Sequence, residues 1–199
     1  YYLYAEASIE LKGYSLLNPG SVYTAAEIAG IVKYARDRHI DVVPCIELYG
    51  HLHDLLRVER YADLGAFQHG WDLDPGKPQA GKLIDDWVEQ IAALFPSPWM
   101  HVGMDEPMEL EKLTTLAKGT ADAGKIYVTH LRKVLETVRR VGKHPMFWAD
   151  VNSGARIFSN YPELFALLPK NAIAVPCHYR SPPEYGPFVA PFAREKVPF

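Results

Sequence analysis

The chain has 199 residues, of which 48% are hydrophobic, and these values predict one domain with a sizeable buried core. Its formal net charge is −3 and its basic residues are scattered, so we expect neither a nucleic-acid partner nor an anionic membrane partner. No apolar run reaches the roughly 20 residues that a membrane span needs.

The first predicted strand covers residues 1–9 and is rich in tyrosine. The sequence begins inside this strand, without Met and without a secretory signal, so we expect it to be a piece of a longer protein and assign it no compartment. Thr24 and Glu27 have the spacing of a capping box, and they predict the start of a helix that ends near Arg36.

Residues 40–48 form the next predicted strand, which is largely apolar, as expected for a strand buried on both faces of a parallel sheet. Residues 52–79 are interpreted as one long loop, of the kind that is usually functional or mobile. The remaining elements keep the same alternation. We expect helices at 83–94, 121–141 and 163–168, strands at 99–104, 145–150 and 172–179, and an irregular acidic segment up to Gly119.

Five strands that alternate with helices predict a parallel sheet with right-handed crossovers. A complete (β/α)8 barrel takes about 250 residues, so we expect residues 1–199 to be a single, partial TIM-barrel domain with about five of the eight β/α units. Flanking sequence would then supply the missing strands. A doubly wound sheet is the alternative, although no glycine-rich phosphate loop follows any of the predicted strands.

Polar side chains stand where the predicted strands end, and in a barrel all of these ends meet on the face that carries the chemistry. They are Glu6, Glu47, His51, Asp105, Glu106, Asp150 and His178. Asp105 and Glu106 can enter one pocket only if their strand has ended, which Pro107 favours, because neighbours on a regular strand face opposite ways. Trp148 and Asp150 are two residues apart, so they can line the same wall.

The histidines permit more than one interpretation. His51 and His53 form a His-x-His pair that could bind a metal ion, but no further ligand set at typical spacing accompanies it. We therefore expect no metal and no other cofactor, and we expect His51 to hydrogen-bond a carboxylate. His101, in the middle of a strand, fits either an interior histidine or a site residue.

The segment His101-Val102-Gly103-Met104-Asp105-Glu106 resembles the His-x-Gly-x-Asp-Glu signature of glycoside hydrolase family 20, the β-N-acetylhexosaminidases. Two further segments resemble that family in the same order along the chain. Residues 43–51 are similar to its Pro-Glu-Ile-Asp-x-Pro-Gly-His region, and residues 147–150 are similar to its Trp-bearing fifth strand.

The resemblance implies a TIM-barrel enzyme that removes terminal β-linked N-acetylhexosamine (GlcNAc or GalNAc) by a retaining, substrate-assisted reaction. Glu106 would be the general acid/base. Asp105 would orient the 2-acetamido group of the substrate, whose carbonyl oxygen is the nucleophile. Together with the positions at strand ends, the expected substrate-binding residues are Glu47, His51, His101, Trp148, Asp150 and Tyr179.

The sequence departs from the family pattern at several positions. Cys45 and Glu47 stand where the family has Glu and Asp, Tyr49 replaces a Pro, and Ala7 stands where a further acid is expected. Two alternatives therefore stay open. One is a barrel glycosidase that acts on sugars without an acetamido group, with Asp105 or Asp150 as a direct nucleophile. The other is a catalytically inactive barrel that binds carbohydrate.

Overall fold

The computed structural model describes residues 1–116, 122–151, 154–178 and 184–199. Within these residues, five short parallel strands form one sheet in which each strand pairs with its neighbour in the sequence. The strands are β1 Tyr2–Tyr4, β2 Val43–Cys45, β3 Trp99–His101, β4 His144–Ala149 and β5 Ile173–Pro176. This sequential order is that of a barrel, whereas the strand order of a doubly wound sheet reverses at a switch point.

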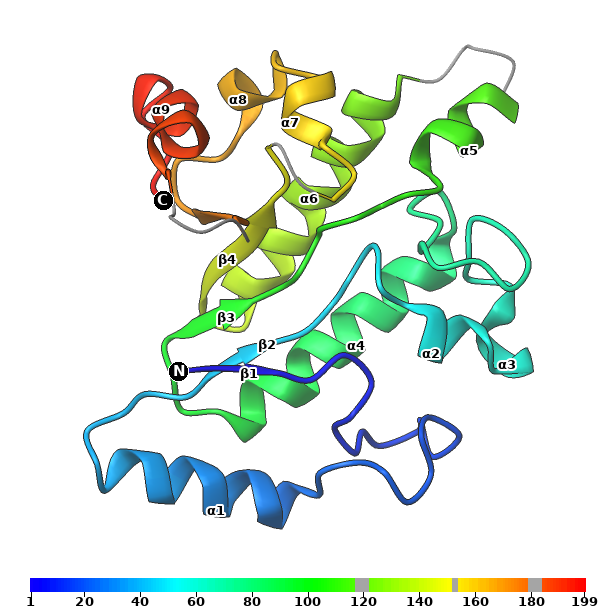
Figure 1. Ribbon diagram of the computed structural model, residues 1–199. Coiled ribbons are helices and arrows are strands. Elements are labelled where there is room, and N and C mark those ends of the chain that lie inside the picture. The colour runs from blue at the N-terminus through cyan, green and yellow to red at the C-terminus, as the bar shows by residue number, and fades with distance from the viewer. Residues whose placement is uncertain (117–121, 152–153, 179–183) are drawn as a thin grey trace.

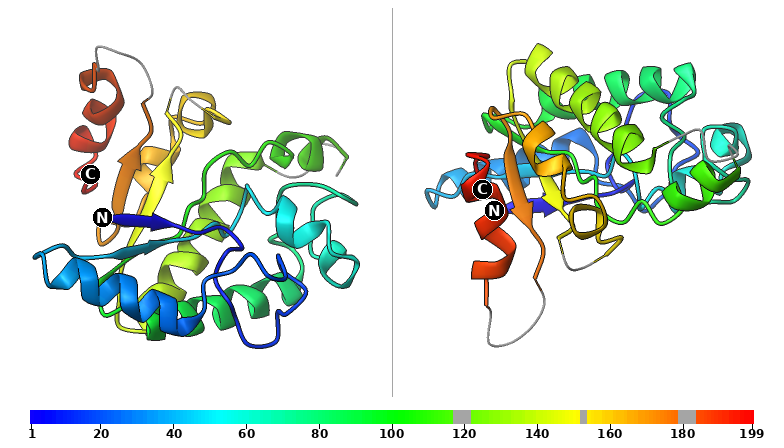
Figure 2. Two further views of the ribbon diagram at one scale, coloured as in Figure 1. Left: turned by 60° about the horizontal axis from the view of Figure 1, so that its bottom comes forward. Right: turned by 90° about the horizontal axis from the view of Figure 1, so that it is seen from above.

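Helices connect the strands, and the three longest lie along the outer side of the curved sheet (Figure 1, Figure 2). These are α1 Ala25–Arg36, α4 Pro78–Leu94 and α6 Ala123–Arg140, whereas α2 His53–Leu56, α3 Glu59–Ala62, α5 Leu110–Leu116, α7 Ile157–Asn160, α8 Leu164–Leu167 and α9 Gly186–Arg194 are shorter. In the described part of the chain, none of the helices is long and apolar enough to cross a membrane.

The start of α1 confirms the predicted capping box. The Thr24 side chain accepts a hydrogen bond from the Glu27 N–H at 3.3 Å, and the Glu27 carboxylate accepts one from the Thr24 N–H at 2.8 Å. Two amide donors that a helix start leaves unpaired are thereby satisfied. The buried side of α6 packs against β4 and against α4, and α4 also packs against α1, so the long helices close the outer layer over the sheet.

The strands are shorter than predicted, as β1 at Tyr2–Tyr4 shows against the expected residues 1–9, and α7 and α9 were not predicted. Two segments that were expected to lack regular structure also contain helices. Residues 52–79 contain α2 and α3, whose single turns are too short to produce a helical period in the sequence. The segment that was expected to be irregular contains α5, where Thr114 and Thr115 both donate side-chain hydrogen bonds to the Glu111 carbonyl. Threonine has a low helix propensity, so the sequence did not predict a helix here. The expectation of one long loop and one irregular segment was wrong.

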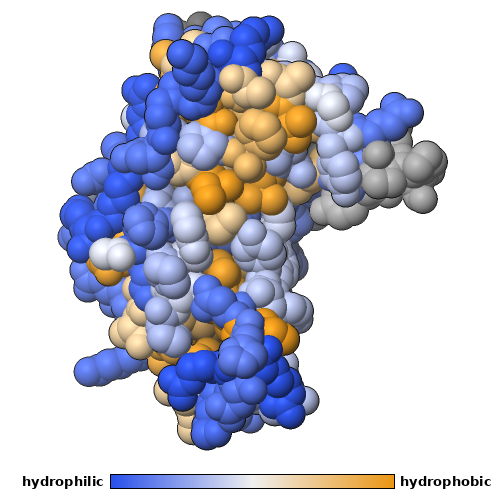
Figure 3. All heavy atoms as spheres, turned by 90° about the vertical axis from the view of Figure 1, so that its left-hand side faces the viewer, coloured by the Kyte–Doolittle hydropathy of each residue, from blue (hydrophilic) through white to orange (hydrophobic). Residues whose placement is uncertain are grey.

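The inner face of the sheet is covered only in part. Strands β1 and β5 are the edges of the sheet in the described residues. Tyr2 and Tyr4 of β1 are exposed, and Ile173 and Val175 of β5 are half-buried. Figure 3 shows hydrophobic side chains gathered on this side of the molecule, which lies at the left of Figure 1. An apolar surface of this kind is normally covered by another element.

Candidate active site

The chain leaves β3 through a turn with an unusual backbone. Gly103, Met104 and Glu106 all have positive φ angles, of 67°, 85° and 48°. A left-handed conformation costs a non-glycine residue about 1 kcal/mol or more, so it persists only where the surroundings fix it. Because the strand has ended at His101, Asp105 and Glu106 are not forced to opposite faces, as the sequence reasoning required.

Side chains from three other elements fix this turn. The Met104 N–H donates to Glu47 Oε2 at 3.2 Å, and the Met104 carbonyl accepts from the Tyr127 hydroxyl at 3.3 Å. The Glu106 N–H donates to Asp150 Oδ2 at 2.8 Å. Glu47 follows β2, Tyr127 belongs to α6 and Asp150 follows β4, so the turn is held from both neighbouring strands and from the helix layer.

His51 joins the two carboxylates. Its Nε2 lies 3.4 Å from Asp105 Oδ2 and 3.1 Å from Glu106 Oε2, and its Nδ1 lies 3.7 Å from Glu6 Oε1. The hydrogen bond to Asp105, together with the three negative charges, raises the pKa of His51 to about 9 in spite of its partial burial. His51 is therefore an imidazolium at neutral pH, with a carboxylate on each side.

The pKa values of Glu47, which is buried, and of the half-buried Asp105 shift in opposite directions. Burial, the charge of Asp105 and a hydrogen bond to it raise the pKa of Glu47 well above its usual value. Burial opposes ionisation of Asp105, but the hydrogen bonds from His51 and Glu47 outweigh it and hold the pKa of Asp105 below its usual value. The two shifts favour the protonated form of Glu47 and the ionised form of Asp105.

Two glycines allow this close packing. A Cβ atom on Gly103 would collide with the Glu47 carboxylate. A Cβ atom on Gly50 would lie 2.7 Å from the Glu106 carbonyl oxygen and would come closer still to that of Asp105. Real side chains essentially never approach so closely, so both positions need a residue without a side chain.

Asp150 supports the other side of the turn. It is 2% exposed, and its Oδ2 accepts hydrogen bonds from the backbone N–H groups of Glu106 and Ala155. Burial raises the pKa of Asp150 to about 6. With Oδ2 occupied by two backbone N–H groups and its side chain enclosed, Asp150 fixes the backbone of Glu106 and offers little to a ligand.

His101 and Trp148 form an aromatic wall below the turn. Their ring centroids are 4.1 Å apart, and Tyr2 approaches both rings from β1. His101 Nδ1 accepts a hydrogen bond from the Gly103 N–H at 3.1 Å, and burial lowers the pKa of His101 to about 3. His101 is therefore a neutral, fully buried imidazole, whereas Trp148 keeps part of its surface accessible.

Three hydrogen bonds join the segment that follows β2 to the segment that follows Asp105 and Glu106. Glu109 Oε2 accepts from the N–H groups of Trp71 and Asp72 at 3.1 Å, and Asp72 Oδ2 accepts from the Glu109 N–H at 2.6 Å. Burial raises the pKa of Asp72 to about 7. We call these hydrogen bonds between Glu109 and Asp72 the clamp. No local sequence pattern predicts it, because Glu109 and Asp72 are 37 residues apart.

Most of the residues expected at the site lie together. His51, Asp105 and Glu106 are in direct contact, and the others surround them: Glu47, His101, Trp148 and Asp150. Glu6 was noted only as one of several polar strand ends, yet it lies against His51 and accepts a hydrogen bond from the Tyr4 hydroxyl at 2.8 Å. Its place directly after β1 was the signal that could have added it to the site.

Other strand-end residues lie elsewhere. Tyr179 lies outside the described residues. His178 accepts a hydrogen bond from the Glu184 N–H at 3.4 Å and packs against Phe188, on the side of α9. His53 begins α2 and meets the ring of Trp71, not the carboxylates. Among the described residues, no group of three His, Cys, Asp or Glu side chains could hold a metal ion.

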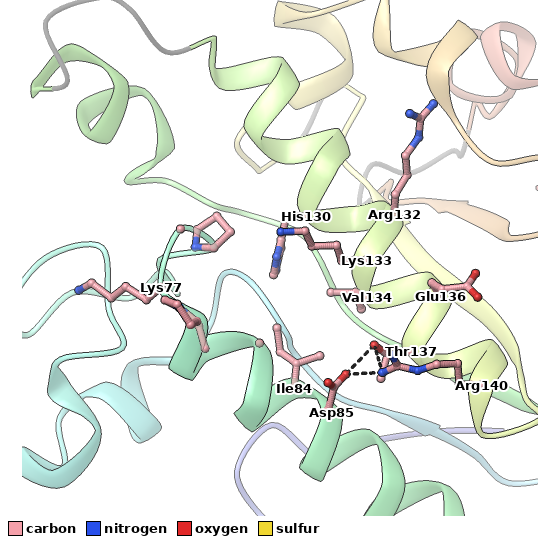
Figure 4. A pocket seen from close by; sticks show the side chains of 15 residues that line it. Lys77, Ile84, Asp85, His130, Arg132, Lys133, Val134, Glu136, Thr137 and Arg140 are labelled. Carbon is pink, nitrogen blue, oxygen red and sulfur yellow. Dashed lines mark hydrogen bonds and ion pairs between the residues drawn. The ribbon is translucent and has the colours of Figure 1, made fainter.

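A separate cavity of about 660 Å³ lies in the helix layer, between α4 and α6 (Figure 4). Asp85, Thr137 and Arg140 hydrogen-bond one another at its rim. His130 reaches from α6 to the Leu48 carbonyl at 2.9 Å, so its buried ring supports the end of β2. The acids near His51, which are Glu6, Glu47, Asp105 and Glu106, form what we call the carboxylate cluster. None of the residues that line the cavity belongs to this cluster.

The carboxylate cluster is suited to proton transfer. Asp105 has a side chain that is 15% exposed and is held ionised, whereas the neighbouring Glu106 is 42% exposed and reaches the surface. A fixed charge beside an accessible carboxyl group is the arrangement that acid–base hydrolysis of an acetal needs.

A family model described as glycosyl hydrolase family 20, catalytic domain, matches residues 6–175. A beta-hexosaminidase of Vibrio furnissii is 28% identical over 163 residues, which cover 72% of this chain and 27% of that protein. Hexosaminidase D of Homo sapiens is 27% identical over 146 residues, which cover 68% of this chain and 30% of that protein. The chain thus spans less than a third of either relative.

Solved structures show the fold. A beta-N-acetylhexosaminidase of Bacteroides fragilis aligns with a TM-score of 0.74 at 21% identity, over 99% of this chain and 43% of that one. A chitobiase of Flavobacterium johnsoniae aligns with a TM-score of 0.69 at 23% identity, over 91% of this chain and 29% of that one. The predicted fold class, an α/β fold of TIM-barrel type of which this chain holds a part, is confirmed.

Proposed function

Because the chain belongs to glycosyl hydrolase family 20, we propose that it forms part of the catalytic barrel of a β-N-acetylhexosaminidase. The substrate is a carbohydrate that ends in β-linked N-acetylglucosamine or N-acetylgalactosamine. The observation that carries the proposal is the pair of adjacent carboxyl groups on one imidazolium, of which Asp105 is half-buried with a lowered pKa and Glu106 is accessible.

In the first step, Glu106 gives its proton to the glycosidic oxygen while the carbonyl oxygen of the 2-acetamido group bonds to the anomeric carbon. The bond to the leaving group breaks, and a cationic oxazolinium ring forms. Asp105 accepts the N–H of the acetamido group and balances the positive charge that develops on it. The ionised state of Asp105 supports this role, because only a carboxylate can do both.

In the second step, the Glu106 carboxylate takes a proton from water, whose oxygen bonds to the anomeric carbon and opens the oxazolinium ring. Two displacements at one carbon restore the original configuration, so the reaction is retaining. The exposed fraction of the Glu106 side chain, 42%, leaves room for both the leaving group and the water.

The surrounding residues have supporting roles in this proposal. His51 aligns both acids, with Glu6 on its other nitrogen, and Glu47 supports the turn that carries Asp105 by accepting the Met104 N–H. Trp148, backed by His101, forms the wall against which the acetamido methyl group packs. Tyr179 is proposed as a further sugar contact.

Residues 1–199 are proposed to be one part of a single barrel domain. The partly covered inner face between β1 and β5 supports this, because further strands of the same polypeptide would complete the sheet and bury it. The strands outside this chain would then carry the remaining contacts to the sugar hydroxyls.

A glycosidase with a direct carboxylate nucleophile fits less well. Asp150 is enclosed and accepts two backbone hydrogen bonds, so it is poorly placed to attack an anomeric carbon. Two rivals remain. A glycosidase with Asp105 as the direct nucleophile would also hydrolyse glucosides, which lack the acetamido group, whereas an inactive, carbohydrate-binding barrel would hydrolyse neither kind of substrate.

The test uses the complete protein and an aryl β-N-acetylglucosaminide. Glu106→Gln should lower turnover by about two to four orders of magnitude, the usual contribution of a general acid. Glu89→Gln, on the exposed side of α4, is the matched control and should keep full activity. A thiazoline analogue of the intermediate should inhibit competitively. Full activity of Glu106→Gln would contradict the assignment of the acid.

A further inference from the structure

The backbone pairing between β2 and β3 stops before the acids begin. The Ile46 N–H donates to the His101 carbonyl at 3.1 Å. Among the described residues, no further backbone hydrogen bond joins the ends of these two strands, residues 47–51 and residues 102–106. Side chains must therefore set the distance between His51, in the first of these segments, and the two acids in the second.

Helix α6 supplies two such side chains. Tyr127 and His130 are three residues apart, so they lie on one face of the helix, and both are buried. The Tyr127 hydroxyl donates to the Met104 carbonyl at 3.3 Å. His130 Nε2 lies 2.9 Å from the Leu48 carbonyl oxygen, and this nitrogen carries the hydrogen, because a carbonyl only accepts.

Both carbonyls lie close in sequence to the residues of the carboxylate cluster. Met104 directly precedes Asp105, and Leu48 stands between Glu47 and His51. The helix that holds these carbonyls leads into β4 and packs against it. A single helix therefore holds the end of β2 and the turn after β3 at a fixed distance from each other.

The ring of Tyr49 packs against both of these side chains. Its centroid lies 4.7 Å from that of His130 and 6.0 Å from that of Tyr127, and the residue is fully buried. The sequence departs from the family pattern at Tyr49, so this packing against α6 is not implied by the family signature. The neighbouring Gly50 lets the two segments approach closely, and the hydrogen bonds from α6 keep them from separating.

We infer that Tyr127 and His130 are positioning residues, which set the distance between His51 and the two acids, Asp105 and Glu106. This inference rests on the proposed function. It gives the helix layer a part in the reaction, through the backbone at the ends of β2 and β3. When either side chain loses its donor, the two strand ends can separate, and the contacts of His51 with both acids lengthen.

The test measures hydrolysis of an aryl β-N-acetylglucosaminide by the complete protein. Tyr127→Phe keeps the buried ring and removes only the hydroxyl. Tyr61→Phe is the matched control, because the hydroxyl of this buried tyrosine also donates to a backbone carbonyl, that of Gly13, at 3.3 Å. Both variants should unfold at a lower urea concentration, since each loses one hydrogen bond. Only Tyr127→Phe should lower kcat, about tenfold, with KM unchanged, because the acids are displaced by a fraction of 1 Å. His130→Phe should also lower kcat, and a kcat equal to that of Tyr61→Phe in either variant would overturn the inference for that residue.

The pKa of His51 is a second readout, which does not depend on catalysis. The titratable groups around this ring are Glu6, His53, Asp54, Asp72, Asp105 and Glu106. A titration of the His51 ring by nuclear magnetic resonance should give a lower pKa in Tyr127→Phe than in the wild type, because the contacts that raise this pKa lengthen. Tyr61→Phe should leave it unchanged. If the wild type does not hydrolyse the substrate, the proposed function has failed, and this titration alone then judges the inference. An unchanged pKa of His51 in Tyr127→Phe would refute it.

Discussion

Gly50 is the position at which one added methyl group should disturb the acid pair most. Its φ angle is ordinary, so a side chain there would meet a problem of space and not of backbone conformation. The Cβ atom of Gly50→Ala would lie 2.7 Å from the Glu106 carbonyl oxygen and would collide with that of Asp105, whereas real Cβ contacts stay beyond 3.0 Å. Both obstacles are backbone atoms, so no flexible side chain can move aside.

The turn must therefore retreat by a distance on the order of 0.5 Å or more, against the hydrogen bonds that fix Met104 and Glu106. Overpacking of this kind costs about 1–3 kcal/mol of stability. A misplacement that approaches 1 Å at the reacting groups costs about 100-fold in rate. We expect Gly50→Ala to lower kcat/KM by about that factor, mostly through kcat.

The assay is hydrolysis of an aryl β-N-acetylglucosaminide by the complete protein, with urea unfolding in parallel. Gly30→Ala is the matched control, because Gly30 lies inside α1 with no atom within 4 Å of the added methyl group. It should keep full activity and gain about 0.5–1 kcal/mol, since alanine is the better helix former. Wild-type kcat/KM in Gly50→Ala would refute the view that this close approach positions the acids.

Three further changes test other parts of the structure by urea unfolding. Thr24→Ala removes the cap of α1 and should cost about 1 kcal/mol at any pH near neutrality; no loss would contradict the capping role. The raised pKa of His51, about 9, means that its stabilising charge is fully present below pH 6.5 and is lost from there to pH 9. The stability advantage of the wild type over His51→Gln should therefore shrink across that window, and a constant difference would contradict the ion pairs. Burial raises the pKa of Asp150 from 3.8 to about 6. As the pH rises from 3.8 to 6, Asp150 ionises in the unfolded chain before it ionises in the folded protein, so the wild type loses stability over this range. Asp150→Asn should escape this loss, and parallel pH profiles for the two proteins would count against an enclosed Asp150.

The order of strands and helices could be predicted from sequence because each signal was local. The apolar run before Asp105, the capping box at Thr24 and the long helical period of α6 each lie within one element. The position of polar residues at strand ends then gave most of the site, because parallel strands bring those ends to one face. His51 and Asp150 were found in this way, although they are distant from Asp105 in the sequence.

The fine geometry of the site could not be predicted, because it depends on contacts between distant residues. Gly103 allowed a turn, but nothing marked Met104 and Glu106 for positive φ angles, which the surrounding hydrogen bonds impose. The raised pKa of Glu47 also depends on contacts between distant residues, since it follows from burial beside Asp105. The clamp between Glu109 and Asp72 joins two segments that have no sequence pattern in common.

The neighbouring carboxyl groups of the site have different surroundings and different proposed roles. Burial raises the pKa of Glu47, whereas the hydrogen bonds from His51 and Glu47 lower the pKa of Asp105. In the proposed reaction, Asp105 therefore balances the cation as a carboxylate, and Glu106 delivers the proton. The family assignment supports the proposed substrate class, and the lowered pKa of Asp105 supports the role proposed for that residue.

The central proposal is that the oxygen of the substrate's own acetamido group is the nucleophile. The most direct measurement is kcat of the complete protein on aryl β-glucosaminides whose N-acyl group carries none, one, two or three fluorine atoms. Fluorine withdraws electrons from the carbonyl oxygen and weakens it as a nucleophile, so kcat should fall steeply at each step, by orders of magnitude across the series. A kcat that does not depend on fluorine content would contradict participation of the acetamido group and the role proposed for Asp105.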